Sequence, residues 1–258
     1  MLFAGDITIA IKIFYQVVDM AEVLGFKIID CGIDEYIKRL LNDIENGGKK
    51  IIVSGNPEVL YNALHNDTLK SLCMQSDIIP DGIGVLIAGR ITGQRFKQKI
   101  AGISIIEEIL KRSRMNNIKI YLLGAEQWVV ERAAEFCREK YNAIIAGFNN
   151  GFFDIDSCEH IIDEINKSGA DVLLVAMGCP KQELFISKYK DQLECKILMG
   201  VGGSFDVISG KVKRAPNWMV NTGLEWLYRV LKEPFRIKRL ASIPKFLFMV
   251  IKRGKKNG

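Results

Sequence analysis

Short apolar runs alternate with amphipathic stretches along most of the chain. Each run is four to seven residues long and ends at a turn residue, which is typical of buried strands. The predicted strands cover 50–53, 118–123, 143–146, 171–177 and 196–199. Helical spacing of apolar residues predicts helices that begin after Pro57 and that cover 127–140, 159–166 and 181–189. This alternation predicts an α/β fold with a Rossmann-like, mostly parallel sheet and right-handed crossovers.

Polar or glycine residues follow the apolar runs at five places. These are Ser54, Asp81, Gly124, Gly178 and Gly202. Ligands of parallel α/β sheets bind beyond the carboxyl ends of the strands. We therefore expect these five positions to converge on one pocket.

The alternation stops near Asp206, and the rest of the chain is basic. Residues 206–258 hold 13 lysines and arginines against three acidic residues, so this segment carries +10 while the whole chain carries +6. Helices are predicted at 218–232 and 244–253. The pattern suggests three parts: residues 1–27 as an N-terminal extension without an assigned role, 28–205 as the α/β core, and 206–258 as a basic amphipathic appendage. Such charge asymmetry indicates a polyanionic partner or a membrane surface.

Composition restricts the cellular compartment of the protein and the kinds of metal or disulfide site that it can form. The six cysteines are scattered without a CxxC pair, which favours free thiols in a reducing compartment. Only two histidines occur, so a multi-histidine metal centre is excluded. The apolar stretch at 7–18 contains Lys12 and is too short to span a bilayer, and it lacks the features of a signal peptide. These features predict a cytoplasmic protein.

Several motifs in a fixed order carry a family resemblance. They are Ser54-Gly55-Asn56, Pro80-Asp81-Gly82, Gly178-Cys179-Pro180-Lys181-Gln182-Glu183, the turn from Gly200 to Asp206, and Glu225–Arg229 with Glu233-Pro234. From about Ile28 to about Leu240 the chain resembles the WecG/TagA/CpsF glycosyltransferases, glycosyltransferase family 26. The resemblance implies inverting transfer of a sugar, N-acetylmannosamine by expectation, from a UDP-sugar donor. The implied acceptor is N-acetylglucosamine linked to undecaprenyl diphosphate, and the implied product enters wall teichoic acid, capsule or another surface polymer. The implied enzyme uses neither a metal nor another cofactor.

Asp81 is the leading catalytic candidate. A carboxylate at a strand end can take the proton from an attacking acceptor hydroxyl, and the adjacent Gly82 leaves room for substrate. The dipeptide alone would equally suit a simple turn. The resemblance, which places the family's proposed base here, favours catalysis.

The candidate substrate-binding residues lie in the same motifs. Ser54 and Asn56 can hold sugar hydroxyls, although Asn56 also suits a helix cap before Pro57. Gln182 opens a helix, and Gly202 and Gly203 form a turn in which backbone N–H groups can approach a phosphate. The resemblance implies a pocket role for Gln182.

Cationic candidates follow from the need to neutralise a leaving diphosphate without a metal. Lys99 stands where the family has arginine, and Lys keeps the charge but loses the bidentate fork. Arg229, Arg236 and Arg239 match arginines of the family's appendage. A solvated basic helix face is the alternative for these residues, and the resemblance gives an edge to Arg229.

Two further readings of the sequence concern a metal motif and other functions. Asp154-Ile155-Asp156 mimics a metal-binding Asp-x-Asp motif, but capping of the following helix explains the pair. A nucleotide-dependent oxidoreductase and a non-catalytic membrane scaffold remain as alternatives. No nucleic-acid partner is expected, and homo-oligomer formation stays open.

The last predicted helix suggests peripheral attachment to the inner face of the cell membrane. Its apolar residues Phe246, Leu247, Phe248, Val250 and Ile251 could enter the interfacial layer, while the lysines and Arg253 face anionic headgroups. The alternative is that this helix packs on the body of the protein.

Overall fold

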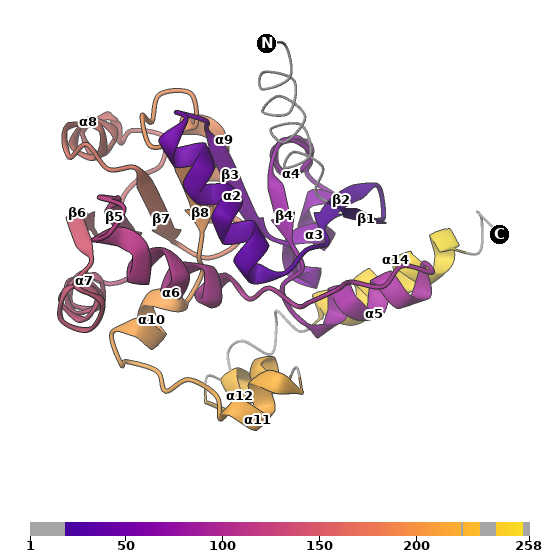
Figure 1. Cartoon of the computed structure of the whole chain (residues 1–258). Coiled ribbons are helices and arrows are strands. Elements are labelled where there is room, and N and C mark those ends of the chain that lie inside the picture. The colour runs from indigo at the N-terminus through magenta and orange to yellow at the C-terminus, as the bar shows by residue number, and fades with distance from the viewer. Residues whose placement is uncertain (1–18, 223, 233–240, 255–258) are drawn as a thin grey trace, which may run out of the picture.

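The computed structural model describes residues 19–222, 224–232 and 241–254 (Figure 1). An eight-stranded sheet runs through the centre, in the order β1-β2-β4-β3-β8-β7-β5-β6. The strands are β1 (Met20–Val23), β2 (Phe26–Ile29), β3 (Lys50–Ser54), β4 (Asp77–Ile79), β5 (Lys119–Gly124), β6 (Ile144–Asn149), β7 (Val172–Ala176) and β8 (Ile197–Gly200). Only β1 is antiparallel to its neighbour, and the other described pairs are parallel. The α/β, mostly parallel architecture predicted from the sequence is thereby confirmed.

Helices cover both faces of the sheet. Those on one face are α3 (Pro57–Ala63), α4 (Asp67–Met74), α5 (Ile83–Ile91), α8 (Glu159–Lys167), α9 (Lys181–Tyr189) and α14 (Ser242–Gly254). Those on the other face are α2 (Ile33–Glu45), α6 (Gly102–Ser113), α7 (Gln127–Tyr141) and α10 (Ser204–Ile208). Strand residues alternate between the two layers: Ile51 and Val53 pack into the first, and Ile52 packs into the second. The sheet is therefore buried on both sides, which explains why its strands read as continuous apolar runs.

The sheet begins before the boundary expected at residue 28. The hairpin of β1 and β2 starts at Met20, and β2 continues the sheet by pairing in parallel with β4. Leu24 and Gly25 form the hairpin turn with positive φ angles. Residues 20–27 thus belong to the α/β core, whereas residues 1–18 lie outside the described part of the chain. Two strands of only four residues each gave too little alternation to be recognised in the sequence.

The C-terminal segment departs from the expected appendage in two ways. The helix predicted at 218–232 is two helices, α11 (Asn217–Asn221) and α12 (Glu225–Lys232), which lie beyond the carboxyl ends of the strands (Figure 1). The sequence has Thr222-Gly223 at the break, and glycine disfavours a helix interior.

The last helix, α14, packs against α3 and α5 (Figure 1). Phe246 and Val250 are fully buried in the core, so these two residues cannot enter a membrane, and the packing alternative is correct for them. Leu247 is partly buried, whereas Phe248 and Ile251 are exposed. No helix in the described ranges is both long enough and apolar enough to cross a bilayer.

Candidate active site

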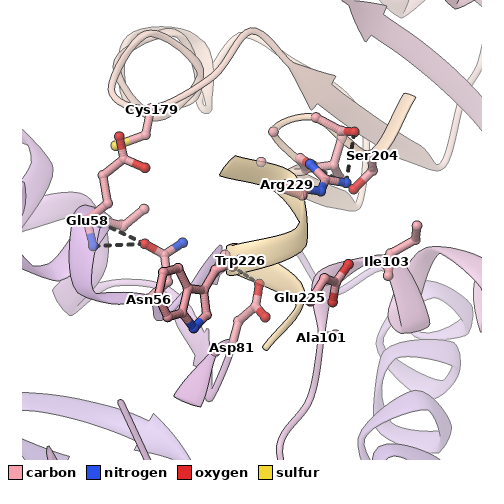
Figure 2. A pocket seen from close by; sticks show the side chains of 18 of the residues that line it. Asn56, Glu58, Asp81, Ala101, Ile103, Cys179, Ser204, Glu225, Trp226 and Arg229 are labelled. Atoms are coloured by element: carbon pink, nitrogen blue, oxygen red, sulfur yellow. Dashed lines mark hydrogen bonds between the residues drawn. The ribbon is translucent and has the colours of Figure 1, made fainter. Parts of the chain in front are cut away.

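The pocket that carries the sequence motifs lies over the ends of β4, β3 and β8, which are neighbours in the sheet. Its volume is about 310 Å³. The side chains and backbone that line it come from Ser54, Asn56, Glu58, Val59, Asp81, Gly82, Lys99, Ala101, Gly102, Ile103, Cys179, Gln182, Gly200, Val201, Gly202, Gly203, Ser204, Glu225, Trp226 and Arg229. Figure 2 shows the pocket, with ten of these residues labelled.

The convergence expected from the strand ends is correct for Ser54, Asp81 and Gly202. Gly124 and Gly178 are not among the lining residues of the described chain. Gly124 ends β5, which is separated from β8 by β7, so the sheet order places it to one side. From the segment that follows β7 along the chain, Cys179 and Gln182 line the pocket.

Asp81 sits in the turn between β4 and α5, held from several directions. Its Oδ2 accepts a hydrogen bond from the Ser54 hydroxyl. The backbone of Gly102, the first residue of α6, also hydrogen-bonds to the carboxylate. Gly82 follows with φ +85°, a backbone conformation that residues with a side chain rarely adopt. No atom lies within 4 Å of the position that a Cβ on Gly82 would take. The carboxylate is thus fixed while the space beside it stays open.

Burial in the pocket raises the pKa of the Asp81 carboxyl above its ordinary value, and the nearby Glu225 carboxylate raises it further. The Ser54 hydrogen bond, the Lys99 ammonium and the Gly102 backbone act in the opposite direction. The net effect is upward. A carboxylate with a raised pKa is a stronger base once ionised, which suits proton abstraction near neutral pH.

Asn56 caps α3 through its side chain. Its Oδ1 accepts hydrogen bonds from the backbone N–H groups of Glu58 and Val59, both at 3.0 Å. The capping interpretation of the sequence is therefore confirmed. These bonds use the oxygen alone, so the Nδ2 donor of this pocket-lining residue remains for a ligand.

Gln182 supports the glycine turn after β8. Its Oε1 accepts the backbone N–H of Gly202 at 3.0 Å, and its Nε2 donates to Glu183 Oε1 at 2.7 Å. The lack of a side chain at Gly200 makes room for the Gln182 amide, because a Cβ at Gly200 would lie 2.7 Å from Gln182 Nε2. The buried Gln182 thus lines the pocket and at the same time fixes the position of the Gly202–Gly203 turn.

Glu183 does not line the pocket itself but contacts Gln182, which does, and the sequence motif that contains it gave it no assigned role. It is 3% exposed, and burial raises the pKa of its carboxyl, with the Gln182 hydrogen bond acting in the opposite direction. The acceptor oxygen of Glu183 determines which way the Gln182 amide points. Glu183 is therefore a positioning residue for the turn.

Helix α12 closes the pocket on the side away from the sheet (Figure 2). It contributes Glu225, Trp226 and Arg229, of which the sequence singled out only Arg229 for a role. The Arg229 guanidinium approaches the Gly203 carbonyl oxygen at 3.4 Å, which places a cation at the glycine turn. The spacing of Glu225, Trp226 and Arg229 on one helical face could have indicated that all three share a surface.

Lys99 lies on the loop before α6 and lines the pocket, as expected. Its Nζ donates to the Val220 carbonyl oxygen at 3.3 Å, so it links the core to α11. Its charge also acts on Asp81. Arg236 and Arg239 lie outside the described residues.

The two aspartates of Asp154-Ile155-Asp156 are not among the residues that line the pocket, and they take part in a local turn and an ion pair. Asp154 Oδ1 accepts the Asp156 backbone N–H at 2.9 Å, and the Asp156 carboxylate pairs with Lys188 at 2.7 Å. The expected capping of α8 does not occur, because Cys158 is its N-cap residue and no side chain caps it. Within the described ranges, no group of three or more His, Cys, Asp and Glu side chains could hold a metal ion. All six cysteines are free thiols.

Comparison with known proteins matches the motifs to one family. A sequence model described as "Glycosyl transferase WecG/TagA/CpsF family" matches residues 21–258. A protein of Bacillus subtilis (strain 168), named N-acetylglucosaminyldiphosphoundecaprenol N-acetyl-beta-D-mannosaminyltransferase, is 35% identical over 223 residues, 86% of each chain. A protein of the same name from Staphylococcus aureus (strain MW2) is 37% identical over 206 residues, 80% of this chain and 81% of that protein.

Proposed function

Because this chain belongs to the WecG/TagA/CpsF family of glycosyltransferases, we propose that it transfers N-acetylmannosamine from a UDP-linked donor to N-acetylglucosamine on undecaprenyl diphosphate. The observation that carries the proposal is the placement of the partly buried Asp81 carboxylate in a pocket that also contains the glycine turn and Arg229. A base and a diphosphate-binding element within one pocket are what direct glycosyl transfer requires. The product would serve the synthesis of a surface polymer such as wall teichoic acid or capsule.

The proposed reaction is a single displacement. The Asp81 carboxylate takes the proton of the acceptor hydroxyl while the hydroxyl oxygen forms a bond to the anomeric carbon of the donor sugar. The bond from that carbon to the UDP oxygen breaks, and its electron pair leaves with UDP. Attack opposite the leaving group inverts the anomeric configuration. Ser54 keeps the carboxylate oriented through its hydrogen bond to Oδ2.

The donor diphosphate would lie at the turn of Gly202 and Gly203. Gln182 holds this turn in place, and Arg229 on α12 adds a positive charge beside it. A guanidinium near the leaving diphosphate stabilises the charge that develops as the sugar departs. Lys99 contributes a second positive charge close to Asp81, and Asn56 offers its Nδ2 to a sugar hydroxyl.

The acceptor implied by the relatives' names carries a lipid, so we propose peripheral contact with the inner face of the cell membrane. Since Phe246 and Val250 of α14 are buried, such contact would use exposed residues such as Phe248 and Ile251 together with the surrounding basic residues.

A donor screen with the purified protein tests the proposal. UDP-N-acetylmannosamine, UDP-N-acetylglucosamine and UDP-glucose are each incubated with an N-acetylglucosamine-diphosphate-lipid acceptor, and released UDP and disaccharide product are measured. We expect product with UDP-N-acetylmannosamine and UDP release that depends on the acceptor. Product with another donor alone would correct the sugar, and absence of transfer from every donor would reject the glycosyltransferase assignment.

A further inference from the structure

A second hollow adjoins the pocket of Asp81 and is mostly apolar. It has a volume of about 200 Å³ and lies where the first turns of α3, α5 and α14 meet α12. Five residues line both the pocket and this groove: Asn56, Glu58, Gly82, Trp226 and Arg229. The residues that line the groove but not the pocket are Pro57, Ile83, Gly84, Val230, Ser242 and Ile243.

The groove is built by close packing of two helix starts. A Cβ on Gly84 would lie 2.4 Å from Pro57 Cγ, so the glycine lets α5 approach α3 at its first turn. Pro57 and Gly84 are buried, and Ile83, Val230 and Ile243 are partly exposed toward the groove. Trp226, which is 37% exposed, lines both the pocket and the groove and therefore lies at their border.

The order of chemistry along this surface matches the order of groups in the proposed acceptor. The pocket with the base Asp81 comes first, then a border where the polar side chains of Asn56, Glu58 and Arg229 line both hollows, then the apolar groove. The acceptor likewise has a sugar hydroxyl, a diphosphate and an isoprenoid chain, in that sequence. A free sugar or a nucleotide would leave the apolar part of this surface unused.

We propose that the groove of Pro57, Ile83, Gly84, Val230, Ser242 and Ile243 binds the isoprene units of the acceptor that lie nearest its diphosphate. This inference rests on the proposed function and adds a lipid subsite to it. The groove takes only the first units, and the rest of the chain remains in the membrane. Burial of isoprene carbons against the groove side chains then contributes to acceptor affinity without touching the reacting atoms.

Two matched pairs of variants test the subsite. Val230→Asn and Ile243→Asn place an amide in the groove, on α12 and α14 respectively. Leu231→Asn and Met249→Asn are their controls on the same two helices: Leu231 is 69% exposed, Met249 is partly exposed, and neither residue lines the groove. Each protein is assayed with two acceptors, N-acetylglucosamine-diphosphate on a long prenyl chain and on a short alkyl group, at the same concentration of nonionic detergent.

We expect the groove variants to lower kcat/KM for the long-chain acceptor about tenfold relative to the short one, the size of effect that loss of one buried apolar side chain gives. The controls should keep the wild-type ratio. An equal fall with Leu231→Asn and Met249→Asn would mean general attachment to lipid and would overturn the subsite. Equal loss on both acceptors in the groove variants would also overturn it, since the groove would then only support the fold.

Separate control experiments test folding and the proposed function. If Val230→Asn lowers the melting temperature, Val230→Ala is used in its place, because it keeps the groove apolar and removes only part of the contact. We then expect a smaller fall in the ratio of kcat/KM for the long-chain acceptor to that for the short one. Wild-type transfer to the short-chain acceptor tests the proposed function by itself. A wild-type enzyme that uses both acceptors with the same kcat/KM has no lipid subsite, although it remains a glycosyltransferase.

Discussion

Replacement of Asp81 by asparagine separates its role as a base from its role in the structure. Asparagine has nearly the same shape, and its Oδ1 can still accept the Ser54 hydroxyl that now binds Asp81 Oδ2. It cannot take a proton from the acceptor. We expect kcat to fall by about two to four orders of magnitude, the usual contribution of a positioned base, which corresponds to about 3 to 5 kcal/mol of activation free energy.

The same substitution has an opposite effect on stability. The pKa of Asp81 is raised in the folded protein, so its protonated form is favoured there, and this stabilisation is present below the ordinary pKa and is lost as the pH rises through the raised pKa. Asparagine removes the cost of holding an ionised carboxylate in the pocket, about 1.4 kcal/mol for each unit by which the pKa is raised. The variant should therefore melt at a higher temperature than the wild type near neutral pH, and this advantage should vanish in acid.

The assay combines both readouts on one preparation. Turnover is measured from UDP release with acceptor present, UDP affinity by calorimetry, and melting temperature from about pH 4 to about pH 8, a range that spans ordinary and raised carboxyl pKa values. We expect low turnover, unchanged UDP affinity and a pH-dependent gain in stability. Near-normal turnover would refute the assignment of Asp81 as the base. A variant that is less stable at neutral pH would refute the raised pKa.

The remaining predictions concern diphosphate binding, the glycine turn and metal dependence. Arg229→Ala should lower kcat/KM about a hundredfold, as loss of one group that stabilises developing charge does, and Arg229→Lys should recover part of that loss. The measurement is steady-state kinetics with varied donor concentration, and an unchanged kcat/KM in Arg229→Ala would show that the assignment is wrong. Glu183→Ala should raise KM for the donor about tenfold, because Gln182 Nε2 loses the acceptor that orients its amide. Glu183→Gln should restore KM. If the alanine variant and the wild type have equal KM, Glu183 does not position the turn. Activity should persist in EDTA, and loss of activity that Mn²⁺ or Mg²⁺ reverses would show that a metal takes part.

The sequence was most informative where the chain forms buried parallel strands. β3, β5, β7 and β8 were predicted within one or two residues, because a strand buried on both faces is a continuous apolar run. The hairpin of β1 and β2 and helix α2 were not anticipated. The hairpin strands are too short for a period to be recognised, whereas α2 does have a helical pattern in Tyr36, Ile37, Leu40 and Ile44 that could have revealed it.

The sequence named several of the residues that line the pocket and predicted that strand ends converge there, but it did not predict the order of the strands. Ser54, Asp81 and Gly202 meet because β3, β4 and β8 are neighbours, and strand order is a tertiary property that no local pattern encodes. The same fact explains why Gly124 was wrongly expected at the pocket. The amphipathic pattern of residues 244–253 could not distinguish burial against α3 and α5 from insertion into a membrane, because both require an apolar face.

The stereochemistry of the product tests the single-displacement reaction at Asp81 most directly. Purified enzyme, UDP-N-acetylmannosamine of known anomeric configuration and a soluble N-acetylglucosamine-diphosphate acceptor are allowed to react, and the new glycosidic linkage is examined by NMR from its one-bond carbon–proton coupling. We expect a single product whose anomeric configuration is inverted relative to the donor. A product with retained configuration would contradict direct attack assisted by one base.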